Sequence, residues 1–286
     1  MTEITLQNNL LNATVRFKGA ELVSLRDAKG RDYMWEGRPD VWGKHAPVLF
    51  PIVGTLKDNQ YRYNGVTYTM GRHGFARDKT FSLEQQSGSE AVFLLTDDAE
   101  TRAMYPFAFE FRIRYRLSDS TLTVTYEVRN TDTSILFFSV GGHPAFALPQ
   151  AFDSYSVAVE PAAVLTYRLL DRDLLSDETA ELDATSGHFA LDYRLFERDA
   201  LVFTSQSCKT LTIREEGHDL LSVDLRDFPD VGLWTKPGAP FLCIEPWHGY
   251  ADTTDASGVL ENKKGIRQLA SGQDFHTAYT IKIHVP

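Results

Sequence analysis

The 286 residues contain only two cysteines, Cys208 and Cys243, and neither lies in a Cys-x-x-Cys or Cys–His pattern. A disulfide framework is therefore excluded. The spacing of the histidines is not that of a ligand set either, so no metal site is predicted. We expect Cys243, which lies within a run of apolar residues, to pack in the core.

Basic side chains are also few, with 29 Lys and Arg against 39 Asp and Glu and a net charge of -10. This balance disfavours contact with a phosphate backbone, so we expect no nucleic-acid partner. No apolar run reaches the length that spans a membrane, and the first residues, MTEITLQNN, lack the basic and apolar segments of a signal peptide. We therefore expect a cytoplasmic protein without membrane association.

Helical periodicity is scarce, and only a short helix near 99–104 is predicted. Short alternating runs of apolar and polar residues, separated by turn residues, predict strands instead. The segment 60–70, QYRYNGVTYTM, has two such arms joined by Asn64-Gly65, a strong hairpin signal. The runs 107–117 and 121–129 should pair as long antiparallel strands. Further strands are expected at 4–7, 11–17, 21–26, 32–35, 135–140, 154–160, 200–204, 210–214, 220–225 and 278–285.

Many short strands without alternating helices predict an all-β sandwich or barrel of antiparallel strands. The sequence has no fixed-period repeat and no linker rich in Pro, Ser and Gly. We therefore expect one domain over residues 1–286.

The stretch 240–250, PFLCIEPWHGY, is the main candidate for chemistry. Its apolar residues 241–244 predict a buried strand, whose end delivers the carboxylate of Glu245 next to Trp247. Burial disfavours the charged form, so the pKa of Glu245 is expected to rise toward the range of a general base. The indole of Trp247 suits the apolar face of a sugar ring. The alternatives are a carboxylate that turns to solvent or caps a loop, and a tryptophan that packs in the core.

Two further loops carry cations beside glycines. In the segment 50–58, Lys57 follows a glycine and could bind a hydroxyl or a phosphate; a solvated lysine is the alternative. In the segment 71–78, glycines bracket Arg72 and His73, and Arg77 adds a planar guanidinium suited to anions or sugar hydroxyls. The alternative for His73 is an exposed loop histidine.

A third histidine, His143, follows two glycines and precedes Pro144, which favours an extended backbone at His143. An imidazole held in this way could hydrogen-bond a ring oxygen and deliver a proton near neutral pH. A core histidine that bonds a backbone carbonyl is the alternative.

Three segments also match a family. HGFAR at 73–77, GGHPAF at 141–146 and KPGAPFLCIEPWHGYAD at 236–252 resemble the aldose 1-epimerase (galactose mutarotase) superfamily, most closely its LacX-type branch. The resemblance extends from about residue 6 to residue 283. It implies a galactose-mutarotase-like β-supersandwich, a small-molecule sugar as substrate, no cofactor or metal, and interconversion of the α and β anomers of an aldose.

By the same resemblance, Glu245 corresponds to the general base of the family and His143 to its general acid. His73 corresponds to the second active-site histidine, which binds sugar hydroxyls or the ring oxygen. A substrate-binding aspartate of the family corresponds only loosely to Asp199.

One position departs from the family. This chain has Thr55 where an arginine usually precedes the hairpin, and Lys57 follows two residues later. Either Lys57 replaces the arginine or a hydroxyl contact is missing.

Other functions remain open at this stage. In a hexose-phosphate 1-epimerase, Arg72, Arg77 and Lys57 could hold the phosphate of a phosphorylated sugar. A carbohydrate-binding or regulatory protein could keep the fold without turnover, as the departure at Thr55 would allow. A glycosidase is less well supported because Glu245 has no clear partner carboxylate. The sequence predicts no oligomeric state.

Overall fold

The computed structural model describes residues 2–284, and within them almost all regular structure is antiparallel β-sheet. The largest sheet has nine strands in the spatial order β17 (His188–Ala190), β14 (Tyr155–Glu160), β19 (Thr210–Glu215), β20 (His218–Asp224), β24 (Asp274–Ile283), β10 (Thr121–Asn130), β9 (Phe109–Ser118), β8 (Glu90–Thr96) and β7 (Ser82–Gln86). The second sheet has the order β16 (Leu174–Asp183), β15 (Val164–Asp171), β18 (Leu201–Phe203), β21 (Asp230–Trp234), β22 (Phe241–His248), β12 (Val140–Gly142) and β4 (Val48–Leu49), and β13 (Ala145–Ala147) also pairs with β22.

Three smaller sheets complete the β-structure of the described residues. The strands β1 (Glu3–Gln7), β2 (Leu11–Arg16) and β3 (Leu22–Asp27) form one sheet, β5 (Gln60–Tyr63) and β6 (Val66–Thr69) form a hairpin, and β11 (Leu136–Phe138) pairs with the distant strand β23 (Arg267–Leu269). The α-helix α1 spans Ala99–Met104, and short 3-10 turns lie at Lys57–Asn59, Ala76–Asp78, Phe152–Ser154, Tyr193–Phe196 and Leu260–Asn262. No helix in the described part of the chain is long and apolar enough to cross a membrane.

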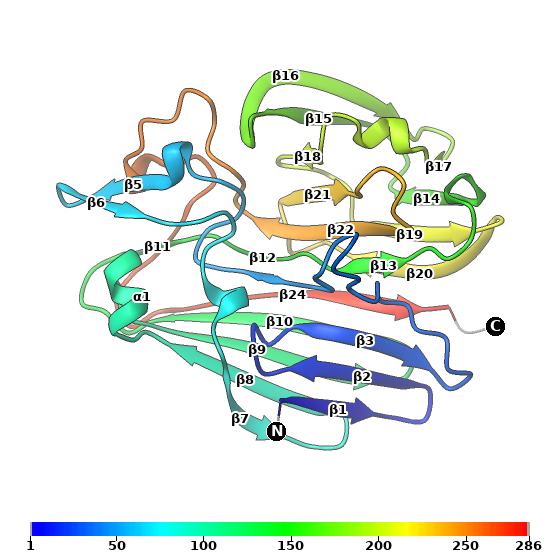
Figure 1. Cartoon of the computed structure of the whole chain (residues 1–286), viewed down its shortest axis with the longest axis horizontal. Helices are drawn as coiled ribbons and strands as arrows, with labels where there is room; N and C mark the ends of the chain where they lie inside the picture. Colours follow the sequence, from blue (N-terminus) through cyan, green and yellow to red (C-terminus); the bar gives the residue numbers. More distant parts are fainter. Residues whose placement is uncertain (1, 285–286) are drawn as a thin grey trace.

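The second sheet lies above strands β24 to β7 of the nine-stranded sheet in Figure 1. Their facing side chains form one large core, to which β9 contributes every second residue, beginning with Phe109 and Phe111, and β22 contributes Leu242 and Ile244. This period of two is the one that the alternating sequence runs predict. The prediction of an all-β fold of antiparallel strands is confirmed.

Strand β22 is buried on both faces along its whole length. Leu242 and Ile244 face the core, so the alternate residues Cys243, Glu245 and Trp247 face the opposite side of the sheet. The apolar run 241–244 predicts a strand that ends before Glu245, and that boundary is wrong because β22 continues to His248. Pro246 has no backbone N–H to donate. It is accommodated inside β22 because the neighbouring segment of the chain, between β12 and β13, is not paired with β22 at this position.

The local predictions agree with the structure where the signal was strong. Asn64 and Gly65 both have positive φ, 48° and 75°, at the turn between β5 and β6, and the runs 107–117 and 121–129 pair as β9 and β10. Helix α1 begins with a capping box between Asp98 and Thr101.

Weaker signals failed. The segment 32–35 forms only isolated bridges, and 135–140 divides into β11 and the start of β12. The predicted strand at 278–285 begins earlier, as β24, and residue 285 lies outside the described residues. The hairpins β7–β8 and β15–β16 were not predicted. Half of the residues of β16 are exposed, and all of these are polar, so the strand lacks the apolar alternation on which the prediction relied.

Candidate active site

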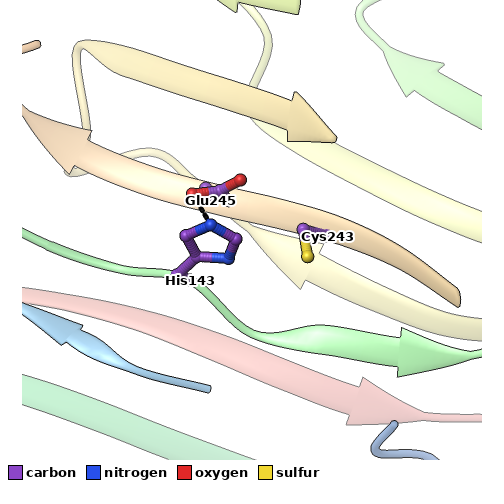
Figure 2. Close-up of side chains that lie close together, drawn as sticks. All are labelled: His143, Cys243 and Glu245. Carbon is purple, nitrogen blue, oxygen red and sulfur yellow. Dashed lines mark ion pairs between the residues drawn. The ribbon is translucent and has the colours of Figure 1, made fainter. Parts of the chain in front are cut away.

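The register of strand β22 brings together two side chains that are about one hundred residues apart in the sequence. Strands β12 and β13 pair with β22 in one common register on either side of their interruption, and His143 lies in that interruption. His143 therefore lies directly opposite Glu245. Its Nε2 is 3.2 Å from Oε2 of Glu245 (Figure 2).

Both groups open onto a cleft of about 290 Å³, close to the lower end of the range for small-molecule sites. Among the predicted residues, the cleft is lined by Glu245, His143, His73, Arg77, Asp199 and Trp247. The structure adds Trp42 and Asp173, which were not predicted, and it also places Trp234 and Arg72 in the lining; Arg72 was considered only as part of a phosphate site. Of the predicted set, only Lys57 lies elsewhere.

Burial controls the protonation of the central pair. Burial raises the pKa of Glu245 well above its usual range, and Asp199 adds to this rise, whereas Arg72 opposes it. The indole N–H of Trp247 also favours the ionised carboxylate, although it makes no hydrogen bond of ordinary geometry. Burial likewise lowers the pKa of His143 to about 3.

The distance between the two groups would suit an ion pair, but burial disfavours both charges. We therefore take the carboxylic acid of Glu245 and the neutral imidazole of His143 as the resting state. A carboxylic acid beside a neutral imidazole carries the same single proton as a carboxylate beside an imidazolium. The pair thus holds one proton in either arrangement, and its two members are 3.2 Å apart.

Aromatic packing, and not a hydrogen bond, orients the imidazole of His143. Its Nδ1 is buried and has no hydrogen-bond partner among the described residues. The ring of Trp42 stacks on the imidazole with a centroid distance of 5.1 Å and an angle of 27°, and the ring of Trp234 meets it edge-on at 5.7 Å. The side chain is held between two indoles. Trp42 was missed because it lies in the irregular segment before β4, where no pattern marks it.

The second histidine has a defined tautomer. The backbone N–H of Gly54 donates to Nδ1 of His73 at 3.1 Å. A backbone amide can only donate, so the proton of the neutral ring must be on Nε2. Burial also lowers the pKa of His73 well below its usual value, which favours this neutral form.

Arg72 places a second donor beside that proton. Its Nε–H points at Nε2 of His73 across 3.3 Å, and it can donate to that nitrogen only in the other tautomer, with the ring proton on Nδ1. Both side chains line the cleft, where each can donate to an oxygen of a ligand. The Nη1 of Arg72 also donates to Asp173, at 3.0 Å, where both side chains are about half exposed at the entrance of the cleft.

Three other lining residues, Arg77, Asp199 and Trp247, are held in place by backbone contacts. Arg77 donates through Nη2 to the backbone carbonyl of Arg72 at 2.8 Å, and this hydrogen bond stabilises the backbone of the loop that carries Arg72. Asp199 has a positive φ of 74° and bonds the next backbone amide. The indole of Trp247 lies against Gly232, where an added Cβ would come within 2.4 Å of the ring.

The structure contradicts the predicted role of Lys57. Its Nζ donates to the carbonyl of Thr254 at 2.9 Å, on a different part of the surface from the cleft. Thr55 is also absent from the lining of the cleft, where Arg72 supplies a guanidinium from another loop. Lys57 was considered as a replacement for the family arginine because it lies two residues from Thr55, but the guanidinium of Arg72, and not the ammonium of Lys57, lines the cleft.

The residues that could hold a metal ion are His143, Cys243 and Glu245. Each offers one ligand atom, and these atoms lie within 4.8 Å of one another. The spacing of histidines in the sequence could not reveal this set, because one ligand comes from the segment between β12 and β13 and the other two come from β22. Cys243 is fully buried, as predicted.

Comparisons with known proteins agree with this architecture. A family model described as aldose 1-epimerase matches residues 2–264. The chromosomal protein LacX of Lactococcus lactis is 30% identical, with 98% of this chain and 99% of LacX aligned. The structure of a galactose mutarotase related enzyme from Lactobacillus acidophilus superposes with a TM-score of 0.94 at 36% identity, over 99% of this chain and 97% of the other. A galactose mutarotase-like protein from Lactobacillus casei gives 0.91 at 31% identity, over 99% and 100%.

Proposed function

This chain belongs to the aldose 1-epimerase family, and from that premise we propose that it interconverts the α and β anomers of an unphosphorylated hexose. The observation that carries the proposal is the pairing of Glu245 with His143 across 3.2 Å at the wall of a small cleft. Both groups needed for proton transfer at a hemiacetal are present there. No cofactor takes part in the proposed reaction.

The reaction needs one proton removed and one supplied. When the pair is in its carboxylate and imidazolium form, Glu245 takes the proton of the C1 hydroxyl while His143 protonates the ring oxygen. The bond between C1 and the ring oxygen breaks, and the open-chain aldehyde forms. The pair is then a carboxylic acid and a neutral imidazole, which is its resting protonation state. Rotation about the C1–C2 bond and the reverse transfers close the ring on the other face.

The other lining residues position the sugar in this proposal. The N–H groups of Arg72 and His73, which both line the cleft, donate to sugar oxygens, and the carboxylate of Asp199 accepts from a hydroxyl. The indole of Trp247 faces the apolar side of the ring. Arg77, predicted as a direct contact, acts here by bracing the backbone of Arg72.

The charges of the cleft favour a sugar without phosphate. Arg72 is already paired with Asp173, and Asp199 adds a second carboxylate to the lining. Arg77 has Asp78 as its neighbouring carboxylate, with 3.7 Å between Nε and Oδ2. A phosphate dianion would have to compete with these groups, and Lys57 is too remote to help.

The decisive experiment follows the optical rotation of freshly dissolved α-glucose and α-galactose, with glucose 6-phosphate as comparison. The protein should accelerate the change for a free aldose more than for its phosphate. Glu245→Gln and His143→Asn should each reduce the enzymatic rate about 10²- to 10⁴-fold, to near background. Glu181→Gln, a change at an exposed residue of β16, serves as the matched control and should retain the rate.

Two results would overturn the proposal in different ways. Faster conversion of the phosphorylated sugar would make the chain a hexose-phosphate 1-epimerase. Calorimetric binding of an aldose with no acceleration would make it a carbohydrate-binding protein. Full activity in Glu245→Gln or His143→Asn would remove that residue from the mechanism.

A further inference from the structure

The acid–base pair has a third neighbour that the proposed reaction does not use. The thiol of Cys243 lies within 4.8 Å of the ligand atoms of His143 and Glu245, and Figure 2 shows the three side chains together. All three are largely or fully buried, and Oε2 of Glu245 has no hydrogen-bond partner among the described residues. A nitrogen, a sulfur and an oxygen donor thus share one small volume.

The backbone makes this arrangement rigid. Cys243 and Glu245 are two residues apart on β22 and therefore project from the same face of the strand. His143 lies opposite Glu245, in the short segment between β12 and β13, both of which pair with β22. Side chains held by paired strands keep their spacing better than side chains on free loops.

The spacing is compatible with a tetrahedral ion. Two ligands at about 2.0 Å from Zn²⁺ are separated by about 3.3 Å along one edge of the tetrahedron. Nε2 of His143 and Oε2 of Glu245 are already 3.2 Å apart. The sulfur, at no more than 4.8 Å from either atom, has to move by roughly 1 Å to reach its own edge length of about 3.5 Å.

We propose that His143, Cys243 and Glu245 form a site for a thiophilic divalent cation such as Zn²⁺, with the fourth position open to the cleft. A thiolate ligand selects Zn²⁺ or Cd²⁺ over Mg²⁺ and Ca²⁺. The cation takes the lone pair of His143 and the carboxylate of Glu245, so it blocks the proton transfers. It therefore inhibits the epimerase in competition with the sugar; this consequence rests on the proposed function, whereas the binding does not.

The surroundings indicate an exchangeable ion, and not a permanent one. A metal-bound histidine usually donates its second N–H to an acceptor, which orients the ring and strengthens binding. Nδ1 of His143 has no such acceptor among the described residues, and the packing of Trp42 has to serve instead. In favour of binding, one divalent cation balances the thiolate and the carboxylate that burial otherwise disfavours.

Cobalt provides a test that does not depend on catalysis. Co²⁺ bound to a thiolate gives a charge-transfer band in the near ultraviolet, so the purified full-length protein is titrated with Co²⁺ and the band is then displaced with Zn²⁺. Cys208→Ala is the matched control because Cys208 is the other buried cysteine and bonds only the carbonyl of Thr210. The wild type and Cys208→Ala should bind one ion per chain with this band.

Cys243→Ala should lose the band and bind Zn²⁺ at least about tenfold more weakly. Cys243→Ser, which nearly preserves the volume, repeats the test should the alanine variant fold poorly. In the anomer assay, Zn²⁺ should raise the apparent KM of the wild type and act at least tenfold more weakly on the Cys243 variant.

No band in the wild type, or equal affinity for Zn²⁺ with and without Cys243, would refute the site. A wild type that binds one Co²⁺ through Cys243 but has no epimerase activity would refute the proposed function and leave the site intact. A wild type that is an active epimerase but shows no Co²⁺ band would refute the metal site and leave the proposed function intact.

Discussion

Arg72 offers the sharpest test of how the cleft holds its substrate. Replacing Arg72 with methionine keeps much of the apolar stem but removes the guanidinium that lies beside His73 in the lining of the cleft. A hydrogen bond from a charged donor to a neutral acceptor contributes about 1.5–3 kcal/mol. Loss of one such bond should therefore lower kcat/KM by about 10- to 150-fold.

The structure also predicts that folding survives this change. The ion pair of Arg72 with Asp173 is about half exposed and should contribute at most about 1 kcal/mol to the free energy of unfolding. A urea titration of Arg72→Met should therefore remain close to the wild type. Arg72→Lys keeps the charge but loses the planar group, so we expect it to recover only part of kcat/KM.

Lys57→Met is the matched control, because Lys57 is the cation closest in sequence to the missing family arginine at Thr55. Its ammonium bonds Thr254 outside the cleft, so kcat/KM should stay within about twofold of the wild type, below the roughly tenfold effect of one charged hydrogen bond. The assay is optical rotation of fresh α-glucose over a range of concentrations. A large loss in Lys57→Met together with full activity in Arg72→Met would refute the assignment and restore the interpretation from sequence alone.

Three further predictions concern packing and burial. Trp42→Ala should lower kcat at least tenfold with little change in KM, because the ring of His143 loses its stacking partner, and Trp42→Phe should recover most of kcat in the same assay. Burial lowers the pKa of His248 to about 4 from its ordinary 6.5, so the unfolded chain takes up the proton first, and about 3 kcal/mol of unfolding free energy is lost as the pH falls from 7 to 4. Urea titrations of His248→Gln should show an acid loss smaller by this amount. Lys263→Met should lower the unfolding free energy by about 3–5 kcal/mol in urea, because it leaves the carboxylate of Asp252 buried without its cation.

Each of these has a contradicting outcome. Equal kcat in Trp42→Ala would mean that the imidazole of His143 needs no aromatic support. An unchanged pH dependence in His248→Gln would show that His248 is not the source of acid sensitivity. A loss below 1 kcal/mol in Lys263→Met would mean that water reaches Asp252 in the variant.

Local interactions explain which parts of the fold could be predicted. The turn at Asn64-Gly65 depends only on neighbouring residues, so the hairpin was recognised. The short helix α1 was also predicted, and the structure shows that local contacts between Asp98 and Thr101 cap it. The strands β9 and β10 carry uninterrupted alternation and were recognised too. The polar hairpin β15–β16 has no such pattern because most of β16 is solvated.

The same distinction between local patterns and long-range contacts applies to the candidate site. Glu245 and His143 were candidates for acid–base chemistry from the sequence, because a carboxylate and an imidazole beside apolar runs and glycines are unusual. Their separation of 3.2 Å was not visible, because it depends on the register between strands that meet only in the folded chain. Trp42 was missed for the same reason, and Arg72 was considered only as part of a phosphate site.

The amino-acid sequence by itself determined the β alternation, the tight turns and the types of group available for acid–base chemistry. The tertiary structure alone decided that Arg72 and not Lys57 reaches the cleft, that Trp42 covers His143, and that Cys243 lies beside the acid–base pair. The physical reason is that a period of two specifies the face on which a side chain lies. Which strand becomes its neighbour depends on how two sheets bury their apolar faces together, and no short stretch of sequence carries that information.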